Sequence, residues 1–163
     1  MIYEVEGDIM MTRAAVIAQG VSVNDPMNRG LARKLGEKFP VLREEFLRWC
    51  EENNPKPGDI WLWGSPDKLR VVNLITSEPG DPALNRPGRP TKIAIHRSLR
   101  ALNRMVLEER LPSIALPRLG EGAGGVDWLE VRAMMHSQLG KLLIPLFVYA
   151  HEVTGMIASE PGM

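Results

Sequence analysis

Short apolar runs alternate with longer segments of helical spacing along most of this chain. Residues 64–67, Gly-Ser-Pro-Asp, join two of the apolar runs directly and predict an antiparallel hairpin. The other runs are separated by helical patterns, and strands connected through helices pair in parallel. We therefore predict an α/β fold, a three-layer α/β/α sandwich on a mixed sheet. The predicted strands are residues 2–6, 14–18, 59–63, 69–75, 113–116 and 142–150, and the predicted helices are residues 31–38, 41–52, 91–109 and 127–140.

Apolar spacing also predicts which side chains the helices bury. The only cysteine, Cys50, follows an apolar helical pattern and is expected to be a small buried side chain. Thr91 is expected to cap the helix over residues 91–109. The inward-facing residues predicted for that helix are Ile93, Ile95, Leu99, Leu102 and Met105.

Charge and segment length narrow the class of protein. Lys plus Arg equals Asp plus Glu, 20 against 20, so no overall charge attracts the chain to nucleic acid or membrane. No apolar run approaches the roughly 20 residues that span a bilayer, and early acidic residues interrupt any signal peptide. We expect a cytoplasmic monomer without a membrane partner, with one domain over residues 1–152 and a flexible tail over residues 153–163.

Residues 116–128, LPRLGEGAGGVDW, hold four glycines between a predicted strand and a predicted helix. The spacing matches the dinucleotide-binding fingerprint, but no second nucleotide-binding half follows this last strand-to-helix turn. Glycines would nevertheless let backbone N–H groups approach a phosphate, and Asp127 and Glu130 form a capping box at the helix start. On these residues alone, an anion cradle and a close-packed turn are equally good interpretations.

Three motifs in one order resemble those of macro domains. Residues 7–9, Gly-Asp-Ile, follow the first strand, and residues 22–35, SVNDPMNRGLARKL, are similar to the family's phosphate-facing loop and helix. Residues 116–128 fit the second phosphate loop. The resemblance covers residues 1–150 and is closest to the branch of terminal ADP-ribose protein glycohydrolase and the antitoxin that removes ADP-ribose from DNA.

The resemblance implies a cleft for ADP-ribose across the strand ends, without a cofactor. Asp8 would accept a hydrogen bond from the adenine amino group, because an amino donor requires an acceptor. Tyr149 would pack against adenine or the proximal ribose, or else lie in the core. Because the chain has a single cysteine and its histidines are scattered, we expect no metal site. The implied ligand-binding residues are Asp8, Ile9, Ser22, Gly30, Leu31, Thr76, Leu119, Gly122, Ala123, Gly124, Gly125 and Tyr149.

The chain departs from this resemblance at positions that concern catalysis. Hydrolases of this branch carry a lysine where Ser77 or Glu78 lies, and the protein-directed relative carries an aspartate where Gly124 lies. In the resemblance, the lysine is a nucleophile for the sugar's anomeric carbon, and the carboxylate transfers protons or stabilises a cationic transition state. Neither Ser77 nor Gly124 replaces those functions directly. Asn28 and Arg29 also replace small residues of the first phosphate loop.

The resulting hypothesis is an ADP-ribose-binding macro domain that hydrolyses ADP-ribosyl linkages on protein, nucleic acid or a small metabolite without a lysine adduct. The catalytic residue is unknown, and the candidates are Ser77, Glu78 and Asp25. A solvated loop charge is the simpler interpretation of each carboxylate. The alternative function is a non-catalytic module that binds ADP-ribose or a related nucleotide, so the chain is not assigned as an enzyme. A third interpretation is an unrelated α/β protein.

The proline- and glycine-rich segment over residues 79–90 is long enough to predict a functional loop without regular structure. Its Arg86 and Arg89, with the following Lys92, would either contact a polyanionic substrate or remain solvated.

Overall fold

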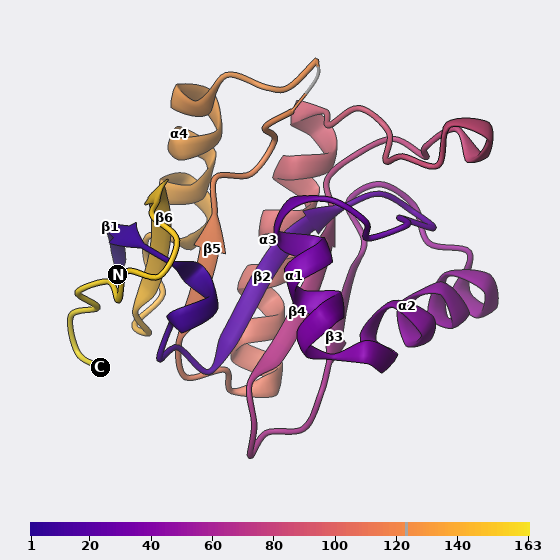
Figure 1. Ribbon diagram of the computed structural model, residues 1–163. Coiled ribbons are helices and arrows are strands. Elements are labelled where there is room, and N and C mark those ends of the chain that lie inside the picture. Colours follow the sequence, from indigo (N-terminus) through magenta and orange to yellow (C-terminus); the bar gives the residue numbers. More distant parts are fainter. Residues whose placement is uncertain (123) are drawn as a thin grey trace.

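The computed structural model describes residues 1–122 and 124–163, and a six-stranded mixed sheet forms its centre (Figure 1). Four successive pairings across the sheet are parallel, whereas β3 joins β4 antiparallel in the predicted hairpin. The predicted fold class is confirmed. In order across the sheet, the strands are β1 (Ile2–Gly7), β6 (Leu146–Glu152), β5 (Ile114–Pro117), β2 (Val16–Val21), β4 (Arg70–Ile75) and β3 (Ile60–Trp63).

Two pairs of helices cover the two faces of the sheet (Figure 1). The pair α1 and α2 packs on one face, and the pair α3 and α4 on the other. The helices are α1 (Gly30–Lys38), α2 (Pro40–Asn53), α3 (Lys92–Glu109) and α4 (Trp128–Leu139), with short 3-10 turns η1 (Ile9–Met11) and η2 (Pro82–Leu84).

Neighbouring residues of the central strand β2 supply the two cores. Val16 packs in one cluster with Leu99 of α3 and Met135 of α4. Ile17 packs in the other cluster with Leu35 of α1 and Phe46 of α2. Successive side chains of a strand point to opposite faces, so an unbroken apolar run is what a strand covered on both sides requires.

One residue predicted to face inward from α3 is exposed. Ile93 has 76% of its surface accessible. The buried stripe recurs at helical spacing and consists of Ile95, Leu99, Leu102 and Val106. Ile93 lies about 200° around the helix from Ile95, because each residue advances the helix by about 100°. Thr91 caps α3 as predicted, its side chain accepting from the Ala94 amide at 3.2 Å.

The segment after β6 packs back against the start of the chain, whereas the sequence alone predicted a flexible tail there. The Val153 amide donates to the Gly7 carbonyl at 2.9 Å, and the Asp8 amide donates to the Met156 carbonyl at 2.6 Å. Ala158 is buried. Because β1 and β6 are parallel neighbours, the chain leaving β6 emerges beside the end of β1 and can run along it (Figure 1).

Gly7 is the point of closest approach between this segment and β1. A Cβ atom at Gly7 would lie 2.8 Å from the Ala158 Cβ and 2.9 Å from the Met156 carbonyl oxygen. We expect Gly7→Ala to lower the free energy of unfolding by about 1–3 kcal/mol, the usual cost of overpacking. Urea denaturation measures the change.

Gly36→Ala is the matched control, because a Cβ there meets nothing within 4 Å and the residue lies inside α1. It should leave stability unchanged or raise it by about 0.5–1 kcal/mol. Equal effects of the two substitutions would contradict close packing at Gly7.

Candidate functional site

Two adjoining cavities open at the edge of the sheet where the parallel strands end. Their volumes are about 670 Å³ and 740 Å³. Together they form one cleft, with the N-terminus of α1 on one side and the segment after β5 on the other. The residues that line both cavities are Gly30, Leu31, Pro117, Arg118 and Glu121.

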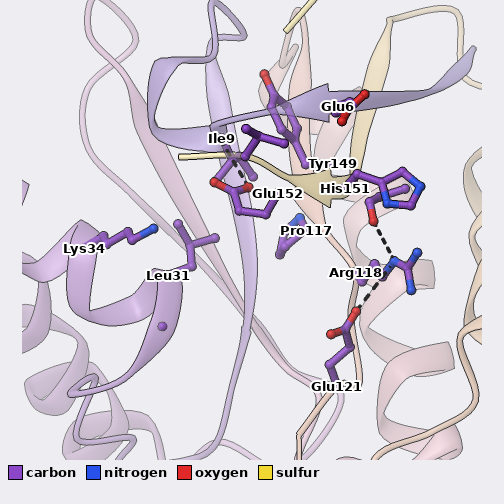
Figure 2. Close-up of a pocket in the computed structure, with 13 residues that line it drawn as sticks. Glu6, Ile9, Leu31, Lys34, Pro117, Arg118, Glu121, Tyr149, His151 and Glu152 are labelled. Carbon is purple, nitrogen blue, oxygen red and sulfur yellow. Dashed lines mark hydrogen bonds and ion pairs between the residues drawn. The ribbon is translucent and has the colours of Figure 1, made fainter. Parts of the chain in front are cut away.

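The first cavity lies at the ends of β1 and β6 and carries acidic side chains. Figure 2 shows Tyr149 and Glu152 of β6 beside Ile9, with Lys34 of α1 across the opening. The Ile9 amide donates to a Glu152 carboxylate oxygen at 3.5 Å, a long hydrogen bond that orients the carboxyl group into this end of the cleft. The sequence did not identify Glu152, because only the pairing of β1 with β6 brings it to Ile9.

Asp8 lies directly behind this cavity and does not line it. One carboxylate oxygen accepts from the Met10 amide at 2.9 Å and the other accepts from the Gly155 amide at 2.9 Å. Burial acts to raise the pKa of Asp8, but the hydrogen bonds from Gly155 and Met10 outweigh it and hold the pKa below its ordinary value. Asp8 is therefore an ionised carboxylate that organises the loop around Ile9.

The Glu152 carboxyl group is shifted in the opposite direction. Partial burial raises the pKa of Glu152 and outweighs the lowering by the hydrogen bond from the Ile9 amide, and the neighbouring Asp8 carboxylate adds a smaller rise. Two carboxyl groups in contact cannot ionise independently, and the group with fewer hydrogen bonds from backbone amides holds a proton longer. The two neighbouring carboxyl groups therefore differ: Asp8, behind the cavity, is firmly ionised, and Glu152, which lines the cavity, keeps its proton to a higher pH because its pKa is raised.

Tyr149 forms the floor of the first cavity and is fixed from below. Its hydroxyl donates to the buried Glu160 carboxylate at 3.0 Å. Burial raises the pKa of the Tyr149 phenol well above its ordinary value, and Glu160 adds to the shift. The phenol therefore stays protonated, and Tyr149, with only 3% of its surface accessible, belongs to the core cluster on this face of the sheet as well as to the lining of the cavity.

The N-terminus of α1 opens into both cavities. Its N-cap, Arg29, makes no side-chain capping hydrogen bond, so the first amides of the helix remain directed toward the cleft. The preceding loop is shaped by Asp25, whose carboxylate accepts from the Ser22 amide at 2.9 Å and the Met27 amide at 2.8 Å. Helix N-termini attract anions, so this side of the cleft suits a phosphate.

The glycine-rich segment after β5 forms the opposite side. Gly120, Gly122 and Gly124 have φ of 78°, 108° and 70°, values that side-chain-bearing residues rarely adopt. Asp127 caps α4 as predicted, accepting from the Leu129 amide at 3.1 Å. The Glu130 side chain pairs with Lys92 at 2.9 Å, so it does not complete the capping box.

The second cavity lies beyond β2 and β4, and Thr76 and Ser77 line it. The Thr91 amide donates to the Thr76 carbonyl at 3.1 Å, and the Glu78 amide donates to the Arg89 carbonyl at 2.8 Å. The proline-rich loop is thereby tied back onto the end of β4. Contrary to the predicted lack of regular structure, it contains the turn η2 and two isolated β-bridges.

Arginines concentrate around the second cavity. Arg29, Arg86 and Arg89 line it, and the Arg89 side chain lies close enough to Gly124 that a Cβ there would be 3.2 Å away. The proline-rich loop and the glycine-rich segment thus meet at Arg89. The smallest residue at position 124 leaves space for that side chain.

Arg118 lines both cavities, and Figure 2 shows its side chain near Glu121 at the edge of the first. Its Nε atom donates to the Ala150 carbonyl at 2.8 Å and lies 3.7 Å from Glu121, while the guanidinium group is 5.1 Å from the Trp128 ring centre. These contacts hold a cation at the centre of the cleft. The sequence did not single out Arg118, although its position before the glycine-rich segment is a signal that could have found it.

A second residue that the sequence did not identify is Gln19, which lines the second cavity. Its side-chain amide donates to the Asn73 side-chain oxygen Oδ1 at 2.9 Å, and both residues are buried. A polar residue within an otherwise apolar strand is the signal that indicates such a pair. The Asn73 side-chain nitrogen has no hydrogen-bond partner within the described part of the chain.

Most of the predicted ligand-binding residues line the cleft, and the others do not. Ser22 is buried beneath the first loop, Glu78 is exposed outside the cavities, and Ala123 lies outside the described residues. Asp8, Gly124 and Gly125 do not line either cavity. The predicted residues that do are Ile9, Gly30, Leu31, Thr76, Leu119, Gly122 and Tyr149, with the catalytic candidates Asp25 and Ser77.

Residues 1–122 and 124–163 show neither a metal-binding group nor a membrane-spanning helix. They contain no group of three histidine, cysteine, aspartate or glutamate side chains placed to hold a metal ion. None of the helices described there is both long and apolar enough to cross a membrane.

The lowered pKa of Asp8 predicts how stability depends on pH. Because the folded state favours the ionised form, this stabilisation is complete above the ordinary value of 3.8 and disappears as pH falls through the lower folded-state pKa. We expect Asp8→Asn to be less stable than the unaltered chain at pH 7, with the difference shrinking below about pH 4. Urea denaturation at pH 3 to 7 measures this. A difference that is as large at pH 3 as at pH 7 would contradict the ionic origin.

Comparisons with known proteins agree with this geometry. No protein-family model matches the chain. The DNA ADP-ribosyl transferase–DNA ADP-ribosyl glycohydrolase fusion protein of Thermosipho africanus is 28% identical over 157 residues, covering 89% of this chain and 40% of that protein. The DNA ADP-ribosyl glycohydrolase of Thermus aquaticus is 26% identical over 142 residues, covering 87% and 39%. The chain thus spans about two fifths of the length of these curated relatives.

Solved structures match a larger share of this chain than the curated relatives do. The macrodomain of Thermus aquaticus DarG has a TM-score of 0.81 at 24% identity, covering 92% of this chain and 98% of that one. Thermosipho africanus DarTG in complex with ADP-ribose has a TM-score of 0.78 at 24% identity, covering 94% and 42%. The resemblance predicted from the three loop motifs is confirmed, and the chain has the macrodomain fold.

Proposed function

We propose that the cleft binds ADP-ribose. Adenine occupies the first cavity, the diphosphate lies between the N-terminus of α1 and the glycine-rich segment, and the distal ribose occupies the second cavity. The observation that carries this proposal is the continuity of the two cavities past those two backbone anion sites. A solved neighbour with the same fold is a complex with ADP-ribose.

The charges along the cleft support this orientation. Glu6 and Glu152 line the first cavity, and a carboxylate there suits the amino group of adenine. Arg118 stands at the centre and Arg29 at the second cavity, where they would neutralise phosphates. The reverse orientation would place adenine among the arginines of the second cavity, away from the carboxylates, and lose this complementarity.

We further propose that the chain hydrolyses an ADP-ribosyl linkage slowly, by directing water to the anomeric carbon. The curated relatives are named as glycohydrolases acting on ADP-ribosylated DNA. Of the three candidate residues, Ser77 has a position suited to water, because it lines the second cavity. Asp25 also lines the second cavity, but its carboxylate is engaged by two backbone amides, and Glu78 lines neither cavity.

The arginines at the second cavity favour a nucleic-acid target over a neutral one. Arg86 and Arg89 lie on the exposed proline-rich loop, where the group attached to the distal ribose would leave the cleft. Phosphates of a nucleic acid are the partners that such side chains bind. The alternative function is a non-catalytic ADP-ribose binder, which the replacement of the lysine by Ser77 or Glu78 favours.

Titration calorimetry tests ligand binding. We expect the unaltered chain to bind ADP-ribose and Asp8→Ala to bind it about tenfold more weakly or worse, because Asp8 holds the loop at Ile9 through hydrogen bonds from two backbone amides, and a hydrogen bond to a charged group contributes about 1.5–3 kcal/mol. Asp67→Ala, which removes an exposed carboxylate from the β3–β4 turn, is the control and should bind normally. Circular dichroism checks that each variant is folded. Failure of the unaltered chain to bind millimolar ADP-ribose would contradict the proposal.

Release of free ADP-ribose distinguishes an enzyme from a binder. We expect slow release from ADP-ribosylated DNA, slower release from ADP-ribosylated protein, and faster release by Ser77→Lys, because lysine supplies a nucleophile. Ser65→Lys in the β3–β4 turn controls for an added charge. If the unaltered chain binds ADP-ribose but releases it from neither substrate, the binding module is the correct alternative.

A further inference from the structure

Residues 153–163 form a strap beneath the first cavity, here called the C-terminal strap. It crosses the end of β1 and the turn η1, and three of its backbone groups contact that loop. The Val153 amide binds Gly7, the Met156 carbonyl accepts from Asp8, and the Gly155 amide donates to the Asp8 carboxylate. The strap therefore contacts the main chain and the side chain of Asp8.

Glu160 anchors the far end of the strap. Only 5% of its surface is accessible, and its carboxylate accepts from the Thr12 hydroxyl, from the Arg13 amide at 2.8 Å and from the Tyr149 hydroxyl at 3.0 Å. These donors come from the segment after η1 and from β6. One carboxylate thus joins the strap to both structures that border the first cavity.

A buried carboxylate is costly unless its oxygens are satisfied, so its position is strongly determined by its donors. Any shift of the strap would remove hydrogen bonds from Glu160. The same shift would also displace Gly155, whose amide holds Asp8 at 2.9 Å. The position of Asp8 is therefore coupled to that of Glu160 through the strap, although the two residues make no direct hydrogen bond in the described structure.

We propose that Glu160 is a positioning residue for base recognition: by anchoring the C-terminal strap, it holds Asp8 and Tyr149 in the arrangement that selects adenine. This inference rests on the proposed binding of ADP-ribose. It assigns Glu160 no contact with the ligand, because Glu160 does not line the cavity and acts through Gly155 and the Tyr149 hydroxyl. Selection of adenine arises because Asp8 orders the loop at Ile9, whose amide holds Glu152, and the Glu152 carboxyl group that lines the cavity accepts from an amino group and disfavours a carbonyl oxygen.

The first measurement needs no ligand. Amide hydrogen exchange of the full chain should be about tenfold faster in Glu160→Gln over residues 7–13 and 153–163, because the loss of a charged acceptor loosens both segments. Residues 76–90, at the other end of the cleft, should be unchanged. Glu4→Gln, which removes an exposed ion pair with Arg132 from β1, is the control. Unchanged exchange in Glu160→Gln would overturn the anchoring function.

The second measurement reports base selection. Calorimetry compares ADP-ribose with its hypoxanthine counterpart, in which a carbonyl oxygen replaces the amino group. The unaltered chain should prefer ADP-ribose by about tenfold, and Glu160→Gln should reduce the preference to about twofold, with little change in affinity for the hypoxanthine ligand. Thr12→Val, which removes one donor to Glu160 outside the cavity, should lower the preference in the same direction.

The outcomes separate positioning from general stabilisation. Faster exchange with an unchanged preference would mean that the strap stabilises the fold without setting Asp8, and it would overturn the proposal. A parallel loss of affinity for both ligands would overturn it as well. If the unaltered chain binds neither ligand, the proposed function fails and base positioning fails with it, whereas the exchange result still decides whether Glu160 anchors the strap. Thr12→Val provides the same readouts if Glu160→Gln does not fold.

Discussion

Parallel hydrogen bonding among β1, β6, β5, β2 and β4 is the constraint on which the rest of this structure depends. It brings the carboxyl ends of five strands to one edge, so loops that are distant in sequence meet there. The residues after β1, β2, β4, β5 and β6 all contribute to the cleft or its support. The antiparallel β3 ends at the opposite edge and contributes no residue to either described cavity.

Backbone amides and side chains contribute to different parts of the cleft. At its centre, the N-terminus of α1 and the glycine-rich segment provide backbone amides, which suit any diphosphate but do not identify the group attached to it. Side chains distinguish the two ends, with Asp8 and Glu152 near the first cavity and Arg86 and Arg89 near the second. A ligand with a base at one end and an anionic attachment at the other matches this gradient of charge.

Local signals were the predictable part of the site. Asp127 precedes an apolar helix and caps α4, and Thr91 does the same for α3, because capping depends on residues within one turn. Glu152 and Glu160 were missed, since the donors to their carboxylates are distant in sequence and no local pattern marks them. Arg118 was missed although it directly precedes the glycine-rich segment. The inward orientation predicted for Ile93 is wrong, because α3 carries apolar residues on more than one face and only packing against the sheet determines which face is buried.

By itself the sequence determined the order of strands and helices, the two loops that present backbone amides, and the absence of lysine at positions 77 and 78. These follow from periodicity, from glycine's conformational freedom and from residue identity, all of which are local. Only the tertiary structure decided that Glu152 borders the first cavity, that Arg89 reaches Gly124, and that the C-terminal strap supports Asp8. The first and third relations arise from the pairing of β1 with β6, and the second from the placement of β4 and β5 on either side of β2, and no local pattern encodes these pairings.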